Sequence, residues 1–169
     1  GDGTFCFGRE YSCCISAMHV ATEDVNGDGS FDIITANYGS DNVSVLLNNG
    51  DGTFGSNNEY AVGFGPKSVE LGDLNEDGLL DLVTADYNNG SVSVLLNNSD
   101  GTFSSSSEYT TGTGDNPDPT SIALGDVNGD GLLDVLATNS YEDSISVLLG
   151  NGDGTFDSTY SLLWCRRFS

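Results

Sequence analysis

One nine-residue pattern of acidic and amide side chains lies near the middle of the chain. Oxygen-bearing side chains occupy positions 1, 3, 5 and 9 of the pattern, and Gly78 at position 6 permits a sharp turn. Oxygen atoms at alternate positions point inward when the chain curls around a point, and oxygen atoms are the donors that Ca²⁺ prefers. The pattern therefore predicts a calcium loop in which the carbonyl of position 7 is a further ligand. Its expected ligands are Asp73, Asn75, Asp77, Leu79 and Asp81.

The same pattern occurs once before and once after this loop. The expected ligands of the first copy are Asp24, Asn26, Asp28, Ser30 and Asp32, and those of the third copy are Asp126, Asn128, Asp130, Leu132 and Asp134. Each loop has carboxylates at positions 1, 5 and 9 of the pattern, and a divalent cation would relieve their mutual repulsion. We therefore expect about three Ca²⁺ ions, one for each loop.

An EF-hand is the nearest alternative for these loops, and the sequence argues against it. An EF-hand needs a glutamate at position 12 and a helix on each side. Position 12 is Thr35, Thr84 or Ala137 here, and the residues after position 9 are rich in β-branched and other apolar side chains. The loops are therefore expected to join strands, so that calcium would clamp the corner of a β-hairpin.

The segments around the loops repeat along the chain. The string Gly-Asp-Gly-Thr-Phe starts at Gly1, Gly50 and Gly152, with a variant at Ser99. Each unit holds a strand before the acidic loop, a strand after it, an apolar third strand, and a fourth strand that runs from Thr-Phe to a tyrosine. In the second unit the strand after the loop is predicted at Leu80–Ala85 and the third strand at Val92–Asn97. The fourth strands are predicted at Thr53–Tyr60, Thr102–Tyr109 and Thr155–Tyr160. Four short strands in each unit are typical of a β-propeller blade.

The repeat predicts an all-β fold of three four-stranded antiparallel propeller-type blades that form an open, incomplete β-propeller. The predicted units are an irregular N-terminal strand with cysteines at 1–16, blades at 17–66, 67–118 and 119–161, and a C-terminal tail at 162–169. A closed propeller needs about 4–8 blades, so the outer blade faces are expected to stay open and to recruit a partner. A second chain could complete a ring, the chain could be a fragment of a longer propeller, or copies could stack head to tail into a filament.

The order of these motifs resembles the FG-GAP/VCBS repeat. Between Ala17 and Tyr160 each unit passes from an inner strand through Asp-x-Asn-x-Asp-Gly-x-x-Asp and apolar strands to Asn-Gly-Asp-Gly-Thr-Phe or a close variant. That repeat builds the propeller of integrin α-chains and of many secreted proteins. The resemblance implies calcium in the loops, an extracellular setting, and a role in adhesion, carbohydrate binding or assembly.

Cysteines and glycosylation sequons also favour an extracellular or cell-surface setting. Disulfides in the irregular ends would tether segments that packing does not hold, with buried free thiols as the alternative. The candidate cysteines are Cys6, Cys13, Cys14 and Cys165, and their pairing stays open. The candidate N-glycosylation acceptors are Asn42, Asn89 and Asn97, all at predicted strand ends or turns.

The charge balance excludes several classes of partner. The chain has 26 acidic residues against 4 Lys and Arg, for a formal net charge of −22. It therefore lacks the cations that contact nucleic-acid phosphates or an anionic membrane surface. No apolar run approaches the roughly 20 residues of a membrane span. We expect neither nucleic-acid binding nor membrane insertion.

No catalytic constellation stands out in the sequence. The only histidine, His19, lies in a predicted strand, and the carboxylates are assigned to the loops. Tyr38, Tyr87 and Tyr141 could form a sugar-stacking rim, although packing at a blade corner explains them as well. The expected function is that of a non-enzymatic, extracellular, calcium-stabilised structural or adhesive module, which self-associates or binds other propeller subunits through its open ends. The alternatives are a lectin-like glycan-binding module and a fragment of a larger integrin-like adhesion propeller.

Overall fold

The computed structural model describes residues 11, 14–112, 118–157 and 160–163, which fold into β-strands joined by turns. The first four strands are β1 (Ala17–Glu23), β2 (Asp32–Asn37), β3 (Asn42–Leu46) and β4 (Asn58–Ala61). The next four are β5 (Pro66–Gly72), β6 (Asp81–Asp86), β7 (Ser91–Leu95) and β8 (Ser107–Thr110). The last four are β9 (Pro119–Gly125), β10 (Asp134–Asn139), β11 (Ser144–Leu148) and β12 (Tyr160–Leu163). Among these described residues there is no helix of the length and apolarity needed to cross a membrane.

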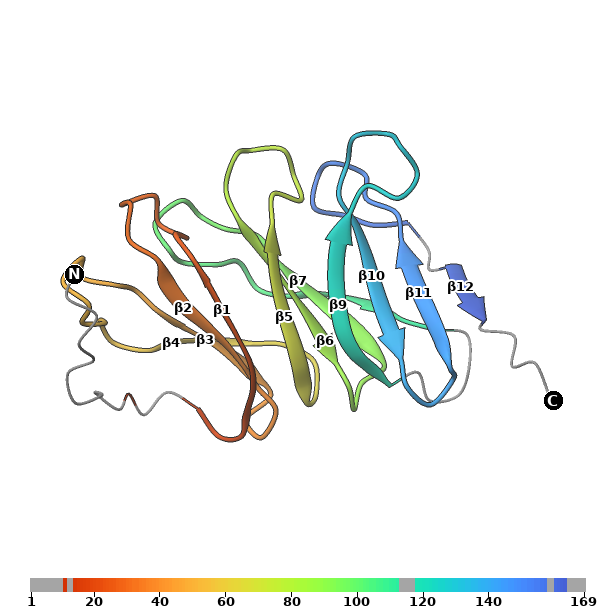
Figure 1. The fold of residues 1–169 in the computed structure, drawn as a ribbon, viewed down its shortest axis with the longest axis horizontal. Helices are drawn as coiled ribbons and strands as arrows, with labels where there is room; N and C mark the ends of the chain where they lie inside the picture. Colours follow the sequence, from red (N-terminus) through yellow and green to blue (C-terminus); the bar gives the residue numbers. More distant parts are fainter. Residues whose placement is uncertain (1–10, 12–13, 113–117, 158–159, 164–169) are drawn as a thin grey trace, which may run out of the picture.

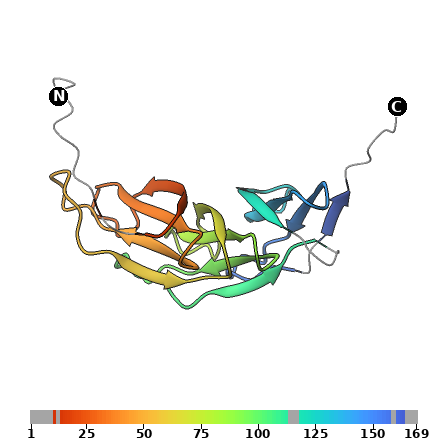
Figure 2. The ribbon, with the colours of Figure 1, turned by 90° about the horizontal axis from the view of Figure 1, so that it is seen from below.

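The strands form three separate antiparallel sheets in which neighbours in sequence are neighbours in space. Blade 1 consists of β1–β4, blade 2 of β5–β8 and blade 3 of β9–β12. Figures 1 and 2 show the blades side by side, with their first strands β1, β5 and β9 along one side of the row. None of the sheets closes into a barrel. The prediction of an all-β fold with three open, four-stranded blades is confirmed.

The middle blade is buried on both faces, which explains its apolar runs. Every residue of β6 and β7 is buried, whereas the corresponding strands β10 and β11 alternate between buried and more exposed residues. A strand covered on both faces does not need the strict alternation of a half-exposed strand. The blade that has neighbours on both sides is therefore the most completely buried part of the fold.

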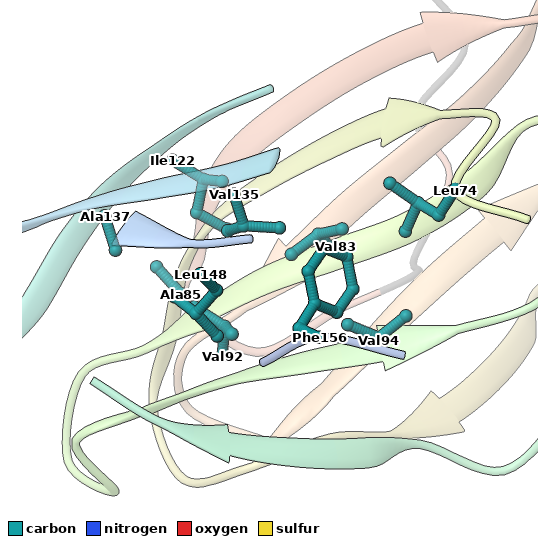
Figure 3. Packing of buried hydrophobic residues seen from close by; sticks show 10 residues of the cluster. All are labelled: Leu74, Val83, Ala85, Val92, Val94, Ile122, Val135, Ala137, Leu148 and Phe156. Atoms are coloured by element: carbon teal, nitrogen blue, oxygen red, sulfur yellow. The ribbon is translucent and has the colours of Figure 1, made fainter. Parts of the chain in front are cut away.

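The hydrophobic core lies between neighbouring blades. The first inter-blade core joins blades 1 and 2 and consists of Val25, Ile34, Ala36, Val43, Val45, Val69, Leu82, Leu95 and Phe103. The second inter-blade core joins blades 2 and 3 and consists of the ten residues labelled in Figure 3. Blade 2 contributes Leu74, Val83, Ala85, Val92 and Val94, and blade 3 contributes Ile122, Val135, Ala137, Leu148 and Phe156. Burial of these side chains is the main favourable contribution to the stacking of the blades.

An edge-to-face aromatic pair crosses each junction. Tyr60 of blade 1 packs on Phe103 of blade 2 with ring centroids 5.6 Å apart, and Tyr109 of blade 2 packs on Phe156 of blade 3 at 5.4 Å. Edge-to-face pairs of this kind add to the energy of area burial. Tyr11 makes the same contact with Phe54 of blade 1, also at 5.4 Å. Tyr11 thus occupies the place that the fourth-strand tyrosine of a preceding blade would fill.

Each fourth strand is shorter than predicted. The strands begin five residues later than expected. In blade 1 the residues just before β4 pair only through an isolated bridge between Asn48 and Phe54, and blades 2 and 3 have the equivalent bridge. Gly50 has a φ of +79°, and Asp51 Oδ1 accepts the N–H of Thr53 at 2.9 Å. The turn leads directly into this bridge, and the N–H of Gly55 donates to the carbonyl oxygen of Leu47 at 2.7 Å. Continuous pairing resumes only at Asn58, opposite Val45, because the fourth strand holds one more residue than the third between these two points.

Candidate metal sites

Each acidic loop joins the first and second strands of its blade at the same edge of the molecule. Loop 1 (residues 24–32) follows β1, loop 2 (73–81) follows β5, and loop 3 (126–134) follows β9. Figure 1 shows the three connections along its upper edge. Residues on either side of each loop pair in the antiparallel ladder, as Gly72 does with Asp81. The loops therefore have the predicted strand–loop–strand setting.

The aspartate at position 1 accepts main-chain N–H groups of its own loop. In loop 2, Asp73 Oδ1 accepts the N–H of Asp77 at 3.1 Å and Oδ2 accepts the N–H of Gly78 at 2.9 Å. Gly78 has a φ of +84°, which glycine adopts without a side-chain clash. Asp24 and Asp126 accept hydrogen bonds from the corresponding N–H groups in loops 1 and 3. Position 1 therefore draws each loop into a closed turn.

Positions 3, 5 and 7 form a second set of hydrogen bonds. Asn75 Nδ2 donates to Asp77 Oδ2 at 3.0 Å, and Asn75 Oδ1 accepts the N–H of Asp77 at 3.1 Å. The N–H of Leu79 donates to Asp77 Oδ1 at 2.8 Å. The same bonds recur in the other loops, where Ser30 and Leu132 occupy position 7. The oxygen-bearing side chains of positions 1, 3 and 5 are thus brought together in every loop.

The loop carboxylates present negatively charged oxygen donors. The N–H of Gly131 is the largest cause that lowers the pKa of the Asp126 carboxyl, and Asn26 is the largest cause that lowers the pKa of Asp28. Ionised carboxylates and amide oxygens fit a hard divalent cation such as Ca²⁺. Within the described ranges, no group of three or more acidic, histidine or cysteine side chains is arranged closely enough to hold a metal ion. The donor chemistry therefore fits calcium, and closure of the ligands around an ion is part of the proposal below.

The aspartate at position 9 has a structural role that sequence reasoning missed. Asp81 is buried, its Oδ2 accepts the N–H of Leu74 at 3.0 Å, and its Oδ1 accepts the N–H of Asn97 at 2.9 Å. These bonds tie the start of the loop to the residues that follow the third strand. The same pair of bonds is made by Asp32 and Asp134. Burial is the main cause that raises the pKa of Asp81, and the nearby charges of positions 5 and 1 raise it further.

Asp81→Ala is expected to lower the free energy of unfolding by about 2–4 kcal/mol, because two main-chain N–H groups lose a buried acceptor. Urea unfolding in the presence of a chelator measures this effect without any contribution from bound metal. The matched control is Asp77→Ala in the same loop, whose side chain is exposed and whose loss should cost less than about 1 kcal/mol. Equal losses in the two variants would contradict the structural role of position 9.

The other candidate residues lie in several different settings. Cys14 is exposed, and Cys6, Cys13 and Cys165 lie outside the described residues, so the predicted disulfides stay predictions. Asn42 is half-buried and Asn89 is exposed. Asn97 is buried and donates from Nδ2 to the carbonyl oxygens of Val25 and Leu80, at 2.9 and 3.0 Å. A glycan on this nitrogen would displace one of these bonds, so Asn97 is a poor acceptor in the folded chain.

The tyrosines that follow the second strands differ in their surroundings. Lys67 Nζ lies 3.0 Å from the centre of the Tyr87 ring and 5.9 Å from that of Tyr38. The hydroxyl of Tyr38 donates to Asn88 Oδ1 at 3.4 Å, and Tyr141 is exposed. A cation covers the face of Tyr87 that a sugar would need. This arrangement favours a packing role for Tyr87 over sugar stacking.

A buried polar position at the end of each second strand also escaped sequence reasoning. Asp86 occupies it in blade 2, where Oδ1 accepts the hydroxyl of Thr84 at 2.7 Å and Oδ2 accepts that of Ser93 at 2.6 Å. Asn37 and Asn139 occupy it in blades 1 and 3. Burial is the main cause that raises the pKa of the Asp86 carboxyl to about 7. Alignment of the repeats with one another would have revealed this position, because asparagine stands there in two of the three units.

Three four-stranded blades in a row, each with an acidic loop between its first two strands, define a β-propeller-like blade protein. The family model described as FG-GAP-like repeat matches residues 24–84, 73–137 and 126–164. The chain belongs to this FG-GAP-like repeat family, and the resemblance seen in its sequence is confirmed.

A solved structure shows the same type of fold. The chain is similar to part of a mutant form of the Photorhabdus luminescens Tc holotoxin pore, with a TM-score of 0.51 and 16% sequence identity. The match covers 88% of this chain and 7% of that chain, so the chain spans a small part of the length of that protein. The search of curated proteins gives no match. These comparisons support the blade fold.

Proposed function

We propose that the chain is a non-enzymatic, extracellular, calcium-stabilised structural or adhesive module that associates through its open blade faces. The calcium part is supported by one observation: in all three loops, hydrogen bonds within the loop gather the side-chain oxygens of positions 1, 3 and 5. The loops lie at the same edge of the blade row (Figure 1). Coordination at that edge would tie the first strand of each blade to its second.

Bound Ca²⁺ would supply positive charge and additional oxygen coordination to each loop. The residues expected to hold it in loop 2 are Asp73, Asn75, Asp77, the carbonyl of Leu79, and Asp81. The chain itself contributes the turn at position 6 and the N–H groups that orient the carboxylates. Three divalent ions would offset six of the 22 net negative charges. Calcium would therefore reduce the self-repulsion that opposes compact stacking of the blades.

A non-enzymatic role is supported by the partners of the two groups most suited to acid–base chemistry. His19 Nδ1 lies 3.0 Å from the carbonyl oxygen of Val69 in the next blade, so the imidazole takes part in a junction. Asp86 has the raised pKa that catalytic acids often show. Its position is nevertheless filled by Asn37 and Asn139 in the other blades, with hydrogen bonds to equivalent serines. We therefore assign structural roles to both His19 and Asp86.

The extracellular setting is supported by family membership and by the type of loop. Weak calcium sites, with dissociation constants of ~10⁻⁴–10⁻³ M, are typical of extracellular modules and remain loaded only where calcium is abundant. Asn89, in the turn before β7, is an exposed candidate acceptor, and a glycan there would replace one of the surface hydrogen bonds that its Nδ2 donates to Ser91 and Glu108. Detection of a glycan on Asn89 in protein from its natural source would support the setting directly.

Native mass measurement is expected to find about three calcium ions on each chain. The double variant Asp73→Ala, Asp77→Ala should lose one ion, because it removes two ligands from loop 2 alone. Asp157→Ala removes an exposed carboxylate outside the loops and should keep every ion. A chain that binds no calcium at millimolar concentrations would overturn the calcium proposal.

A further inference from the structure

The outer face of blade 1 repeats a surface that is buried elsewhere in the molecule. Val69 of blade 2 and Ile122 of blade 3 are 0% and 5% exposed, because each packs on the preceding blade. Val20 occupies the same repeat position in blade 1 and is 59% exposed. Met18 on the same strand is exposed as well. At Val20, blade 1 therefore displays the apolar side chain that inserts into a neighbour at both internal junctions, whereas Phe54 of the same blade is covered by Tyr11.

The outer face of blade 3 repeats the complementary surface. A hollow of about 220 Å³ is lined there by Ser121, Ile122, Ala123, Leu136, Thr138 and Ile145. Leu136 and Ile145 occupy the repeat positions of Val83 and Val92, which pack against Ile122 in the second inter-blade core (Figure 3). The hollow thus includes the two side chains, Leu136 and Ile145, whose equivalents receive an inserted residue at the second internal junction.

Position 2 of the acidic loop is also exposed in blade 3, although it is buried in blades 1 and 2. Val25 and Leu74, at position 2 of loops 1 and 2, are 2% and 3% exposed because the following blade covers them, whereas Val127 of loop 3 is 52% exposed. A hydrogen bond crosses each internal junction at this point. Asn97 Nδ2 donates to the Val25 carbonyl oxygen at 2.9 Å, and the N–H of Gly154 donates to that of Leu74 at 3.1 Å.

Asn48 of blade 1 is placed to make the same bond to a preceding blade. Its Nδ2 donates to the carbonyl oxygen of Phe31 at 3.0 Å, as Asn97 Nδ2 donates to that of Leu80. Asn97 uses its second amide hydrogen to cross the junction, and no acceptor for the second amide hydrogen of Asn48 is found among the described residues. Blade 1 therefore carries a junction donor, and blade 3 carries the matching carbonyl of Val127.

We propose that blade 1 of a second copy of this chain packs on blade 3 of the first, head to tail. Val20 of the second copy enters the hollow beside Leu136 and Ile145, and its Asn48 donates to the Val127 carbonyl. The inference rests on the proposed association through open faces, and it adds the partner and the polarity of the contact. Because two different surfaces meet, repeated contacts give a closed ring of two chains or an open filament.

Two arginine variants test the polarity. Val20→Arg blocks the blade 1 face, and Thr138→Arg, at an exposed position, blocks the blade 3 face. Light scattering after size exclusion, in calcium and about 0.15 M salt, should show wild-type species larger than a monomer and each variant alone as a monomer. An equimolar mixture of the variants should give a dimer, because one intact blade 1 face meets one intact blade 3 face. Arginine lowers the net negative charge, so greater repulsion cannot explain the loss of assembly.

The matched control is Tyr141→Arg, which adds the same charge in the exposed turn between β10 and β11 and should assemble like the wild type. Circular dichroism checks the fold of each variant, and Met18→Arg on the same strand replaces Val20→Arg if that variant fails to fold. A monomeric wild type, a variant that assembles alone, or a mixture that stays monomeric would overturn the head-to-tail contact. A monomer whose melting temperature still rises with calcium would leave the calcium proposal standing.

Discussion

Calcium is expected to raise the melting temperature of the metal-free chain by roughly 10–30 °C. Each site stabilises the fold by RT ln(1 + L/Kd), where L is the free calcium concentration. This term is about 1.4–2.7 kcal/mol at about 10 mM calcium for a Kd of ~10⁻⁴–10⁻³ M. The three loops together then contribute about 4–8 kcal/mol, and each 1 kcal/mol shifts the Tm of a domain of this size by about 2–4 °C. Calorimetry in calcium and in chelator measures the shift.

Charge screening alone would also stabilise so acidic a chain, so the controls must separate screening from binding. Sodium chloride at the same ionic strength and magnesium at the same concentration should give much smaller shifts, because Mg²⁺ demands a tighter geometry. A triple variant, Asp28→Ala, Asp77→Ala, Asp130→Ala, removes one ligand from each loop and should lose most of the rise. Identical melting temperatures in calcium and in chelator would contradict the calcium proposal.

Asp86→Asn is expected to stabilise the chain near pH 8 by up to about 4 kcal/mol and to have little effect near pH 4. Burial is the largest cause that raises the pKa of the Asp86 carboxyl to about 7, and the charge of Glu108 adds to the increase. Hydrogen bonds from Ser93 and Thr84 act in the opposite direction. Asparagine keeps the polar partners that Asn37 has in blade 1, without a charge.

The sign of the pH effect follows from the direction of this pKa shift. The unfolded chain releases the Asp86 proton near the ordinary pKa of 3.8, whereas the folded chain holds it up to about pH 7. Between these values the folded state binds more protons, so the free energy of unfolding falls as pH rises, by about 1.4 kcal/mol per pH unit. The contribution of the protonated carboxyl is therefore fully present below pH 3.8 and is lost as pH rises through about 7.

Urea unfolding of the wild type and of Asp86→Asn across this pH range, at constant calcium, measures the effect. The difference between the two proteins is the readout, because the loop carboxylates titrate in both. Asn37→Asp is the matched control, since it places a carboxyl in the equivalent buried position of blade 1 and should make that variant lose stability with rising pH. Parallel pH profiles for the wild type and Asp86→Asn would contradict the assignment.

The repeated parts of the fold could be predicted because each unit gave the same local signals. The run Val92–Asn97 indicated a buried strand, and β7 covers Ser91–Leu95. The run Leu80–Ala85 indicated the strand after the acidic loop, and β6 covers Asp81–Asp86. Short runs rich in valine and leucine, bounded by turn residues, are sufficient for such assignments.

The remaining features depend on contacts between segments that are distant in the sequence. Position 9 reads as a metal ligand locally, and only the packed blade shows that Asp81 Oδ1 accepts the N–H of Asn97. The burial of Asn97 likewise depends on the neighbouring blade, whose Val25 carbonyl oxygen accepts its amide hydrogen, and not on local polarity. The fourth strands were predicted too long because continuous pairing lapses between the bridge at Phe54 and Asn58, where the fourth strand holds one more residue than the third.

The placement of the core between blades, and not at a shared centre, makes this chain close to a one-dimensional lattice. Its cooperativity then depends on nearest-neighbour coupling at two junctions, so the terminal units can fray while the middle unit keeps its amide protons shielded from exchange. Duplication or deletion of the gene segment for one blade would change the length of such an array while leaving every remaining junction intact.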